Sequence, residues 1–217
     1  MARPQITLKI ASSLDGKIAL ANGMSEWITG EKAREEGRKL RALHDAIAVG
    51  ANTAILDNPQ LTTRLSGEPN PIRVIFDSKL RLSAQSNLAL TAKETPVWVF
   101  TSVTSKKHAN TLKKQGVQIF PVTADPYIDL EVALQILHEN GVKSLLVEGG
   151  GTLAASFLSL DAIDIIEWFR APMILGGDGR NSIGALELSD MNLVKRFNRI
   201  DIRDFGDDIH ERYERIG

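Results

Sequence analysis

Short apolar runs that alternate with amphipathic stretches constrain the fold of this chain more than any other feature. Runs of this length, apolar on both faces, are typical of buried parallel strands. The segments between them carry helix signals, such as a capping Thr29, Ser105 or Asp129 and a glycine that ends the pattern. We therefore predict an α/β domain with strands over 6–11, 45–49, 72–76, 97–101, 117–122 and 144–147 and helices over 30–43, 105–115, 129–140 and 150–158.

The last third of the chain has a different pattern. Residues 163–174 are β-like, and 193–205 and 209–213 look like two further strand runs on either side of Gly206-Asp207-Asp208. A turn of this composition between two such runs is typical of an antiparallel hairpin. We expect a mainly parallel central sheet flanked by helices, with a C-terminal antiparallel hairpin, in a single domain that spans residues 1–217.

Composition excludes several classes of function. Lys plus Arg number 26 and Asp plus Glu 27, a balance that argues against a nucleic-acid partner. The chain has no cysteine, which excludes disulfides, thiol nucleophiles and cysteine-held metals, and its 4 histidines form no HxxxH pair, so we expect no metal site. No apolar run approaches the roughly 18 residues of a membrane span, and no signal peptide is visible, so we expect a soluble cytoplasmic protein with no membrane partner.

Three consecutive glycines, Gly149 to Gly151, join the last predicted parallel strand to a helix. Glycine lets the backbone approach a ligand, and a helix start directs free N–H groups toward phosphate or diphosphate. A tight strand-to-helix turn without a ligand explains the same pattern, and both interpretations stay open here. A second cluster, Gly176-Gly177-Asp178-Gly179, is more typical of a loop or bulge.

The end of the run over 97–101 leads into Ser102, Thr104, Ser105 and Lys106, with no acidic residue. Sites that prefer NAD place a carboxylate on the ribose 2′-hydroxyl, whereas hydroxyls and a lysine suit a 2′-phosphate. If a dinucleotide binds, this favours NADP over NAD. A plain capped helix start explains these residues equally well.

Polar residues gather in the first third. Lys9 interrupts an apolar strand, which indicates either a snorkelling side chain or one that faces an anion or a substrate hydroxyl. Arg41 lies at the border of the apolar face of its predicted helix, while Arg34 and Arg38 point toward solvent and pair with nearby glutamates. Asp57 begins a motif typical of a turn, Asp-Asn-Pro, and Arg64 follows shortly after it.

As a set, the motifs of this chain are recognisable. In order and spacing, the chain resembles the reductase domain of bacterial riboflavin biosynthesis, which is the pyrimidine reductase half of a bifunctional deaminase-reductase, and its stand-alone homologues. The resemblance covers nearly the whole chain. It is carried by the stretches 11–19, 25–30, 45–50, 57–62, 71–78, 146–153 and 171–177, together with Thr53 and Arg64.

The resemblance implies a fold similar to dihydrofolate reductase and a homodimer. It implies NADPH-dependent reduction of the ribosyl group of 5-amino-6-(5-phosphoribosylamino)uracil to a ribityl group. The substrate would be held by Ser25, Arg41, the Leu61 backbone and Arg64, with both arginines on its phosphate, and its ribose would be surrounded by Lys9, Asp57 and Glu148. NADPH would contact Ala11, Trp27, Thr53, Asp57, Ser78 and the stretch Gly150, Gly151, Thr152, Leu153, Ala154, Ala155 and Ser156.

The implied chemistry is hydride transfer to ribose C1′ after the phosphoribosylamine opens to an imine. Lys9, Asp57 and Glu148 are all candidates for proton delivery, and the sequence does not choose among them. For this chemistry Arg41, Arg64 and the helix that starts at Gly150 must face one cleft. Two alternatives stay open: a reductase of the non-deaminated 2,5-diamino-6-ribosylamino-pyrimidinone 5′-phosphate, and a non-catalytic NADP-binding module.

The chain departs from the family pattern in two ways. It contains neither the HxE nor the PCxxC motif of the zinc deaminases, so the resemblance does not extend to the deaminase half. Ile165 stands where the family often has Glu, next to Asp164. We expect that position to be peripheral to the site.

Overall fold

The computed structural model describes residues 2–103, 106–124 and 126–216. The chain divides into two compact units. The first comprises Met1–Gln5 and Arg38–Leu146, and the second comprises Ile6–Gly37 and Val147–Gly217. Helix α1 (Glu31–Ala42) and strand β7 (Ser144–Glu148) carry the chain between them. None of the helices in the described part of the chain is long and apolar enough to cross a membrane.

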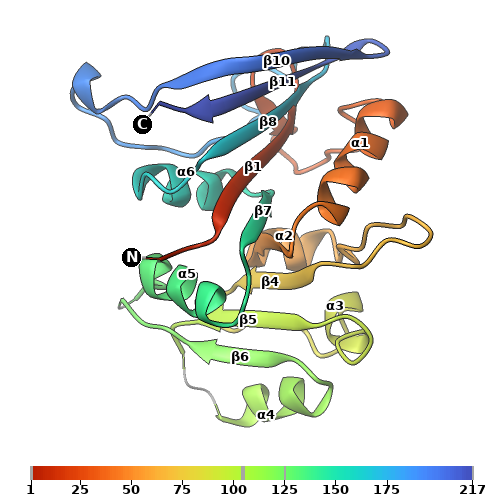
Figure 1. The fold of residues 1–217 in the computed structure, drawn as a ribbon, viewed down its shortest axis with the longest axis vertical. Coiled ribbons are helices and arrows are strands. Elements are labelled where there is room, and N and C mark those ends of the chain that lie inside the picture. Colours follow the sequence, from red (N-terminus) through yellow and green to blue (C-terminus); the bar gives the residue numbers. More distant parts are fainter. Residues whose placement is uncertain (1, 104–105, 125, 217) are drawn as a thin grey trace. The chain divides into compact units, whose positions relative to one another are not determined.

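The first unit contains a parallel sheet. Strands β3 (Ala46–Gly50), β4 (Ile72–Phe76), β5 (Val97–Thr101) and β6 (Gln118–Pro121) pair in that order, all in parallel. Figure 1 shows β4, β5 and β6 side by side. The helices of this unit are α2 (Ala51–Leu56), α3 (Asn87–Leu90), α4 (Lys106–Lys114) and α5 (Leu130–Glu139).

Strands β3, β4 and β5 are buried along almost their whole length, which explains why they read as continuous apolar runs, whereas β6 is only partly buried. On one face, β-branched side chains such as Ile75 and Val99 pack into a cluster with Leu88 of α3 and Leu112 of α4. Phe76, Phe100 and Phe120 form an aromatic row across three strands, with ring centroids 5.5 and 5.1 Å apart. Stacked rings at such distances stabilise neighbouring strands beyond the area they bury.

The second unit contains the hairpin. Strand β1 (Gln5–Ser12) pairs in parallel with β8 (Ile165–Arg170), and β8 pairs antiparallel with β11 (Asp208–Arg215), which pairs with β10 (Phe197–Phe205). Figure 1 shows β10, β11, β8 and β1 in this order. The remaining elements are α6 (Gly151–Ser159), the short strands β2 (Lys17–Ala19) and β9 (Arg180–Asn181), and a 3-10 turn, η1 (Met191–Leu193).

The predicted fold class, a mainly parallel sheet flanked by helices with an antiparallel C-terminal hairpin, is confirmed. Several local details differ. The β-like run over 163–174 is a strand only over Ile165–Arg170. Strand β10 begins later than expected, because Asp190 caps the 3-10 turn that precedes it. Strands β2 and β9 were not expected, because each is too short to show a periodicity.

The start of α1 is a further difference. We expected Thr29 as the cap, but the helix begins at Glu31, and the carbonyl of Gly30 accepts the bond from the Arg34 N–H. The expected cap of α5 is confirmed, since the Asp129 side chain accepts from the Val132 N–H. Ser105, the third expected cap, lies outside the described residues.

Candidate active site

The glycine loop connects β7 to α6 in the second unit. Gly149 and Gly150 have φ angles of 96° and 85°, which residues other than glycine rarely adopt. The N-cap residue of α6 is Gly150, which has no side chain to accept from the first N–H groups of the helix. Free N–H groups at a helix start, together with the helix dipole, are suited to an anion.

Gly151, the third glycine, has a different reason to be glycine. A Cβ there would collide with the backbone carbonyl oxygen of Asn181. The same segment returns a hydrogen bond, 2.8 Å long, from the Gly184 N–H to the Gly151 carbonyl. One of the three glycines is therefore required for packing within the protein. The sequence pattern alone did not distinguish this role from ligand binding.

The expected cofactor contacts on α6 divide by exposure. Leu153, Ala154 and Ala155 are buried in the core, whereas Thr152 and Ser156 are exposed. The Ser156 hydroxyl donates to the Thr152 carbonyl over 3.0 Å. A ligand at this helix therefore has access to the loop backbone and to these two hydroxyl side chains.

Lys9, Ala11 and Glu148 are also in the second unit, and all three are partly buried. Lys9 lies in β1, and its Nζ is 5.7 Å from the ring centroid of Phe169 in β8. Glu148 is the last residue of β7, immediately before the glycine loop. The structure thus places a lysine within β1 and a carboxylate at the end of β7.

The segment before α1 carries Ser25 and Trp27, both exposed. The Arg34 guanidinium lies 4.3 Å from the centre of the Trp27 ring, donates to the Thr29 carbonyl over 2.7 Å and forms an ion pair with Glu31. The expected local pairing of Arg34 with a glutamate is confirmed. Its stacking on Trp27 was not anticipated, because the two residues lie outside one helical repeat.

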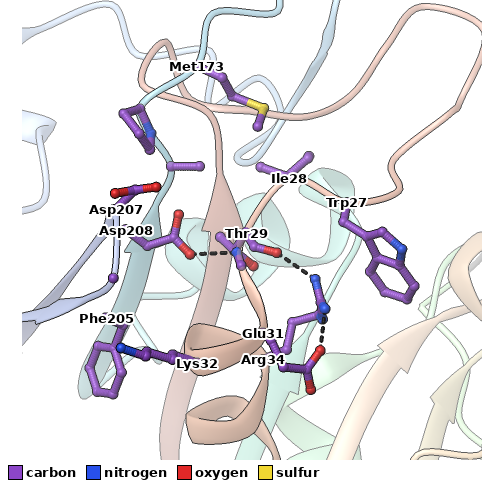
Figure 2. Close-up of a pocket in the computed structure, with 14 residues that line it drawn as sticks. Trp27, Ile28, Thr29, Glu31, Lys32, Arg34, Met173, Phe205, Asp207 and Asp208 are labelled. Atoms are coloured by element: carbon purple, nitrogen blue, oxygen red, sulfur yellow. Dashed lines mark hydrogen bonds and ion pairs between the residues drawn. The ribbon is translucent and has the colours of Figure 1, made fainter.

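A cavity of about 510 Å³ opens beside this segment, as Figure 2 shows. It lies between the start of α1, the segment after β8 and the turn of the β10–β11 hairpin. Of the predicted site residues, only Trp27 lines it. Its walls are Trp27, Ile28, Thr29, Gly30, Glu31, Lys32, Arg34, Ala171, Pro172, Met173, Phe205, Gly206, Asp207 and Asp208.

In the first unit, the structure brings Arg41 to the loop that carries Leu61 and Arg64. The Arg41 Nη1 donates to the Thr62 carbonyl over 3.0 Å. Leu61 and Arg64 have φ angles of 55° and 54°, a strained conformation for side chains of this size. Leu61 is buried, whereas Arg64 is exposed and has no hydrogen-bond or ion-pair partner among the described residues.

Thr53, Asp57 and Ser78 follow the carboxyl ends of β3 and β4 in the same unit. Asp57 ends α2, and its N–H donates to the Thr53 carbonyl over 3.1 Å. The carboxyl ends of parallel strands in one sheet lie at one edge, where α/β proteins bind their ligands. The three residues therefore share the edge of the sheet at which a ligand is expected.

The hydroxyl cluster expected after β5 is only partly described. Thr104 and Ser105 lie outside the described residues. The Ser102 hydroxyl lies within hydrogen-bond distance of the carbonyls of Ser78 and Pro126, at 2.8 and 3.0 Å. This hydroxyl therefore serves the backbone in the structure. Among the described residues, no group of three His, Asp or Glu side chains is arranged to hold a metal ion.

Comparison with known proteins places the chain in a family. Residues 4–210 match the model of the RibD C-terminal domain. The chain is 40% identical over 176 residues to riboflavin biosynthesis protein RibD of Bacillus amyloliquefaciens, an alignment that covers 80% of this chain and 47% of the relative. The chain spans about half the length of the RibD relatives it matches.

A shorter relative is matched over most of its length. The chain is 36% identical over 193 residues to 2,5-diamino-6-ribosylamino-4(3H)-pyrimidinone 5′-phosphate reductase of Methanothermobacter thermautotrophicus, covering 87% of this chain and 88% of the relative. Among solved structures, RibD of Acinetobacter baumannii matches with a TM-score of 0.85 and 31% identity, over 99% of this chain and 59% of that one.

Proposed function

The chain belongs to the RibD C-terminal domain family, and on this basis we propose that it is an NADPH-dependent oxidoreductase of riboflavin biosynthesis. Its reaction would convert the ribosyl group of 5-amino-6-(5-phosphoribosylamino)uracil into a ribityl group. The observation that carries the proposal is that Arg41 contacts Thr62, two residues before the exposed Arg64, because two guanidinium groups at one loop are suited to a sugar phosphate.

We assign the substrate phosphate to Arg41 and Arg64. Arg41 fixes the loop through Thr62, and Arg64 is free to bind an anion. Arginine presents a planar fork that grips phosphate oxygens in pairs, which a flexible lysine does not. Ser25 and the Leu61 backbone complete the proposed substrate contacts, and Lys9, Asp57 and Glu148 are proposed to surround the ribose.

The cofactor assignment rests on the start of α6. A helix start without a side-chain cap, preceded by two glycines of positive φ, fits the diphosphate of a dinucleotide. We propose further contacts from Ala11, Trp27, Thr53, Asp57 and Ser78. When bound, NADPH would supply the hydride; the protein residues hold the substrate, exclude water and deliver the proton.

A second candidate substrate is the non-deaminated pyrimidine. The Methanothermobacter relative that matches over most of its length is named for the 2,5-diamino compound. Nothing in the phosphate grip distinguishes the two rings, since both compounds carry the same 5′-phosphate. We propose the deaminated uracil as the preferred substrate and the diamino compound as its competitor, and we propose that the protein acts as a cytoplasmic homodimer.

The test is NADPH oxidation, followed by absorbance, with each of the two pyrimidines. Replacing Arg64 with Gln removes a charged hydrogen bond worth about 1.5–3 kcal/mol, so KM should rise about 10- to 100-fold. This difference in KM between wild type and Arg64→Gln should disappear with the dephosphorylated substrate. Arg81→Gln, another exposed arginine of the first unit, is the matched control.

Two outcomes would contradict the proposal. If neither pyrimidine is reduced although NADPH binds tightly, the chain is a non-catalytic NADP-binding module. If both pyrimidines are reduced but Arg64→Gln and Arg81→Gln behave alike, the phosphate is held elsewhere, and the assignment to Arg64 is wrong.

A further inference from the structure

We infer that Phe169 is a positioning residue for the Lys9 ammonium, and that a buried His210–Glu167 pair holds the Phe169 ring in place. The inference rests on the proposed function, because Lys9 is one of the residues proposed to surround the ribose. It concerns one face of the sheet in the second unit, where β1, β8 and β11 lie side by side.

The register of the three strands brings these side chains together. Lys9 of β1 is opposite Glu167 of β8, which is opposite Arg212 of β11. Two residues further along β8, Phe169 is opposite His210. Because side chains alternate between the faces of a sheet, all five share one face.

Phe169 is held from two directions. It is 1% exposed, and the His210 ring stacks on it with centroids 4.5 Å apart and planes 28° apart. The Phe205 ring meets it edge-on at 6.1 Å. The Lys9 Nζ lies 5.7 Å from its centroid, within the roughly 6 Å over which an ammonium is attracted to a ring face. A ring held in one orientation therefore holds the Lys9 ammonium at one position above its face.

His210 is itself fixed by a buried carboxylate. Its Nε2 lies 2.7 Å from the Glu167 Oε2, and both side chains are almost fully buried. The other Glu167 oxygen pairs with the guanidinium of Arg212. The His210 Nδ1 is buried and has no hydrogen-bond partner among the described residues. The bond to Glu167 is thus the polar contact that sets the ring orientation of His210.

Helix α1 limits Lys9 from a further side. A Cβ built at Gly37 would lie 3.6 Å from the Lys9 Cε and 3.7 Å from its Nζ, which is van der Waals contact. The lysine stem therefore runs between the helix backbone and the sheet, with few rotamers open to it. Contacts of this length are ordinary, so the nearness of Lys9 does not itself require glycine at position 37.

The test is a double-mutant cycle on the single-turnover rate of NADPH oxidation at saturating substrate. Phe169→Leu should lower this rate about tenfold with little change in KM, because the Lys9 ammonium loses its attraction to the ring while the substrate contacts remain. In the Lys9→Met background, the same change should have less than about a twofold effect. Trp168→Leu, an aromatic-to-leucine change in the same strand but on the opposite face, is the control and should stay within about twofold of wild type.

The outcomes separate this inference from the proposed function. If Phe169→Leu lowers the rate by the same factor with and without Lys9, Phe169 does not act through Lys9, and the inference is overturned while the reductase proposal stands. If Lys9→Met retains the full rate, the proposed role of Lys9 is wrong and the positioning inference falls with it. If no variant and no wild-type chain oxidises NADPH, the proposed function itself fails.

A second variant keeps the inference testable if Phe169→Leu does not fold. Glu167→Gln keeps the volume of the side chain but removes the charge that orients His210. We expect about a threefold loss of rate that vanishes in the Lys9→Met background. An equal loss in both backgrounds would overturn the inference.

Nuclear magnetic resonance of lysines labelled at Cε adds a readout without cofactor: the ring current of Phe169 should shift the Lys9 signal, and Glu167→Gln should reduce that shift.

Discussion

Asp15 shows how one side chain can order two distant loops. Its Oδ1 accepts from the Ser13 hydroxyl over 2.5 Å and from the Leu175 N–H over 3.1 Å, and its Oδ2 accepts from the Gly176 N–H over 2.8 Å. These contacts fix the second glycine cluster to the loop that follows β1. The cluster is therefore a structural loop in this protein, as its sequence indicated.

The same hydrogen bonds make the stability of the protein depend on pH. The Ser13 hydroxyl, followed by the N–H groups of Leu175 and Gly176, lowers the pKa of Asp15 from 3.8 to about 2. A carboxyl whose pKa is lower when folded stabilises the fold at a pH above its unfolded pKa, and this contribution is lost as pH falls. The stability difference between wild type and Asp15→Asn should shrink as pH falls from about 4 to about 2, as urea unfolding measures. A constant Asp15→Asn difference across this range would contradict the assignment.

Gly151 allows a second prediction at the scale of one residue. Gly151→Ala should destabilise the protein by about 1–3 kcal/mol, because its Cβ would strike the Asn181 carbonyl. Gly177→Ala is the matched control, since no atom lies within 4 Å of a Cβ built there. Thermal unfolding compares the two. Equal melting temperatures for both variants would show that the Asn181 segment moves aside freely, and Gly151 would then be glycine for a ligand alone.

Helix α1 depends on the hairpin for its cap. The Asp208 Oδ2 accepts from the Gly30 N–H over 2.6 Å, as Figure 2 shows, although 178 residues separate the two. Asp208→Ala should therefore cost about 1 kcal/mol of unfolding free energy, the usual loss of a capping side chain. Asp208→Asn, which keeps an acceptor oxygen, should cost less. Asp207→Ala, at the exposed neighbouring position, serves as control, and a loss as large as that of Asp208→Ala would show that the turn matters rather than the cap.

The contrast between α1 and α5 shows which features of an element a sequence reveals. The cap of α5, Asp129, is adjacent to its helix, so a local pattern identifies it. The partner of Gly30 comes from the opposite end of the chain, and no local pattern contains that information. Strands buried on both faces, such as Ile72–Phe76, were predicted within a residue, because a strand buried on both faces has a continuous apolar sequence that a local pattern reveals.

The candidate site was predictable to a similar extent. The glycine loop and Arg41 stand out in the sequence because glycine runs and charged residues at an apolar border are locally unusual. The sequence does not show that Arg41 contacts Thr62, or that Gly151 packs on Asn181, because both depend on tertiary contacts. The buried Glu167–His210 pair was missed for the same reason, since neither residue has a motif of its own.

At the scale of the whole molecule, the outer strand of the hairpin carries the remaining prediction. Strand β10 pairs with β11 on one side, and no other strand of the second unit, among the described residues, pairs with it. Its Ile200 and Ile202 are 53% and 52% exposed. An open strand edge with apolar side chains is a place where two chains pair.

We therefore expect the proposed homodimer to form through β10. Wild type should sediment with a mass of about twice the 23.8 kDa of one chain at micromolar concentration. The Ile200→Lys, Ile202→Lys double variant should sediment as a single chain, because lysine side chains along an edge strand oppose its pairing with a second strand. Leu43→Lys, at an exposed leucine of the first unit, should remain dimeric. A wild-type protein that stays monomeric at every concentration would contradict the homodimer. A double variant, Ile200→Lys with Ile202→Lys, that still dimerises would place the interface on another surface.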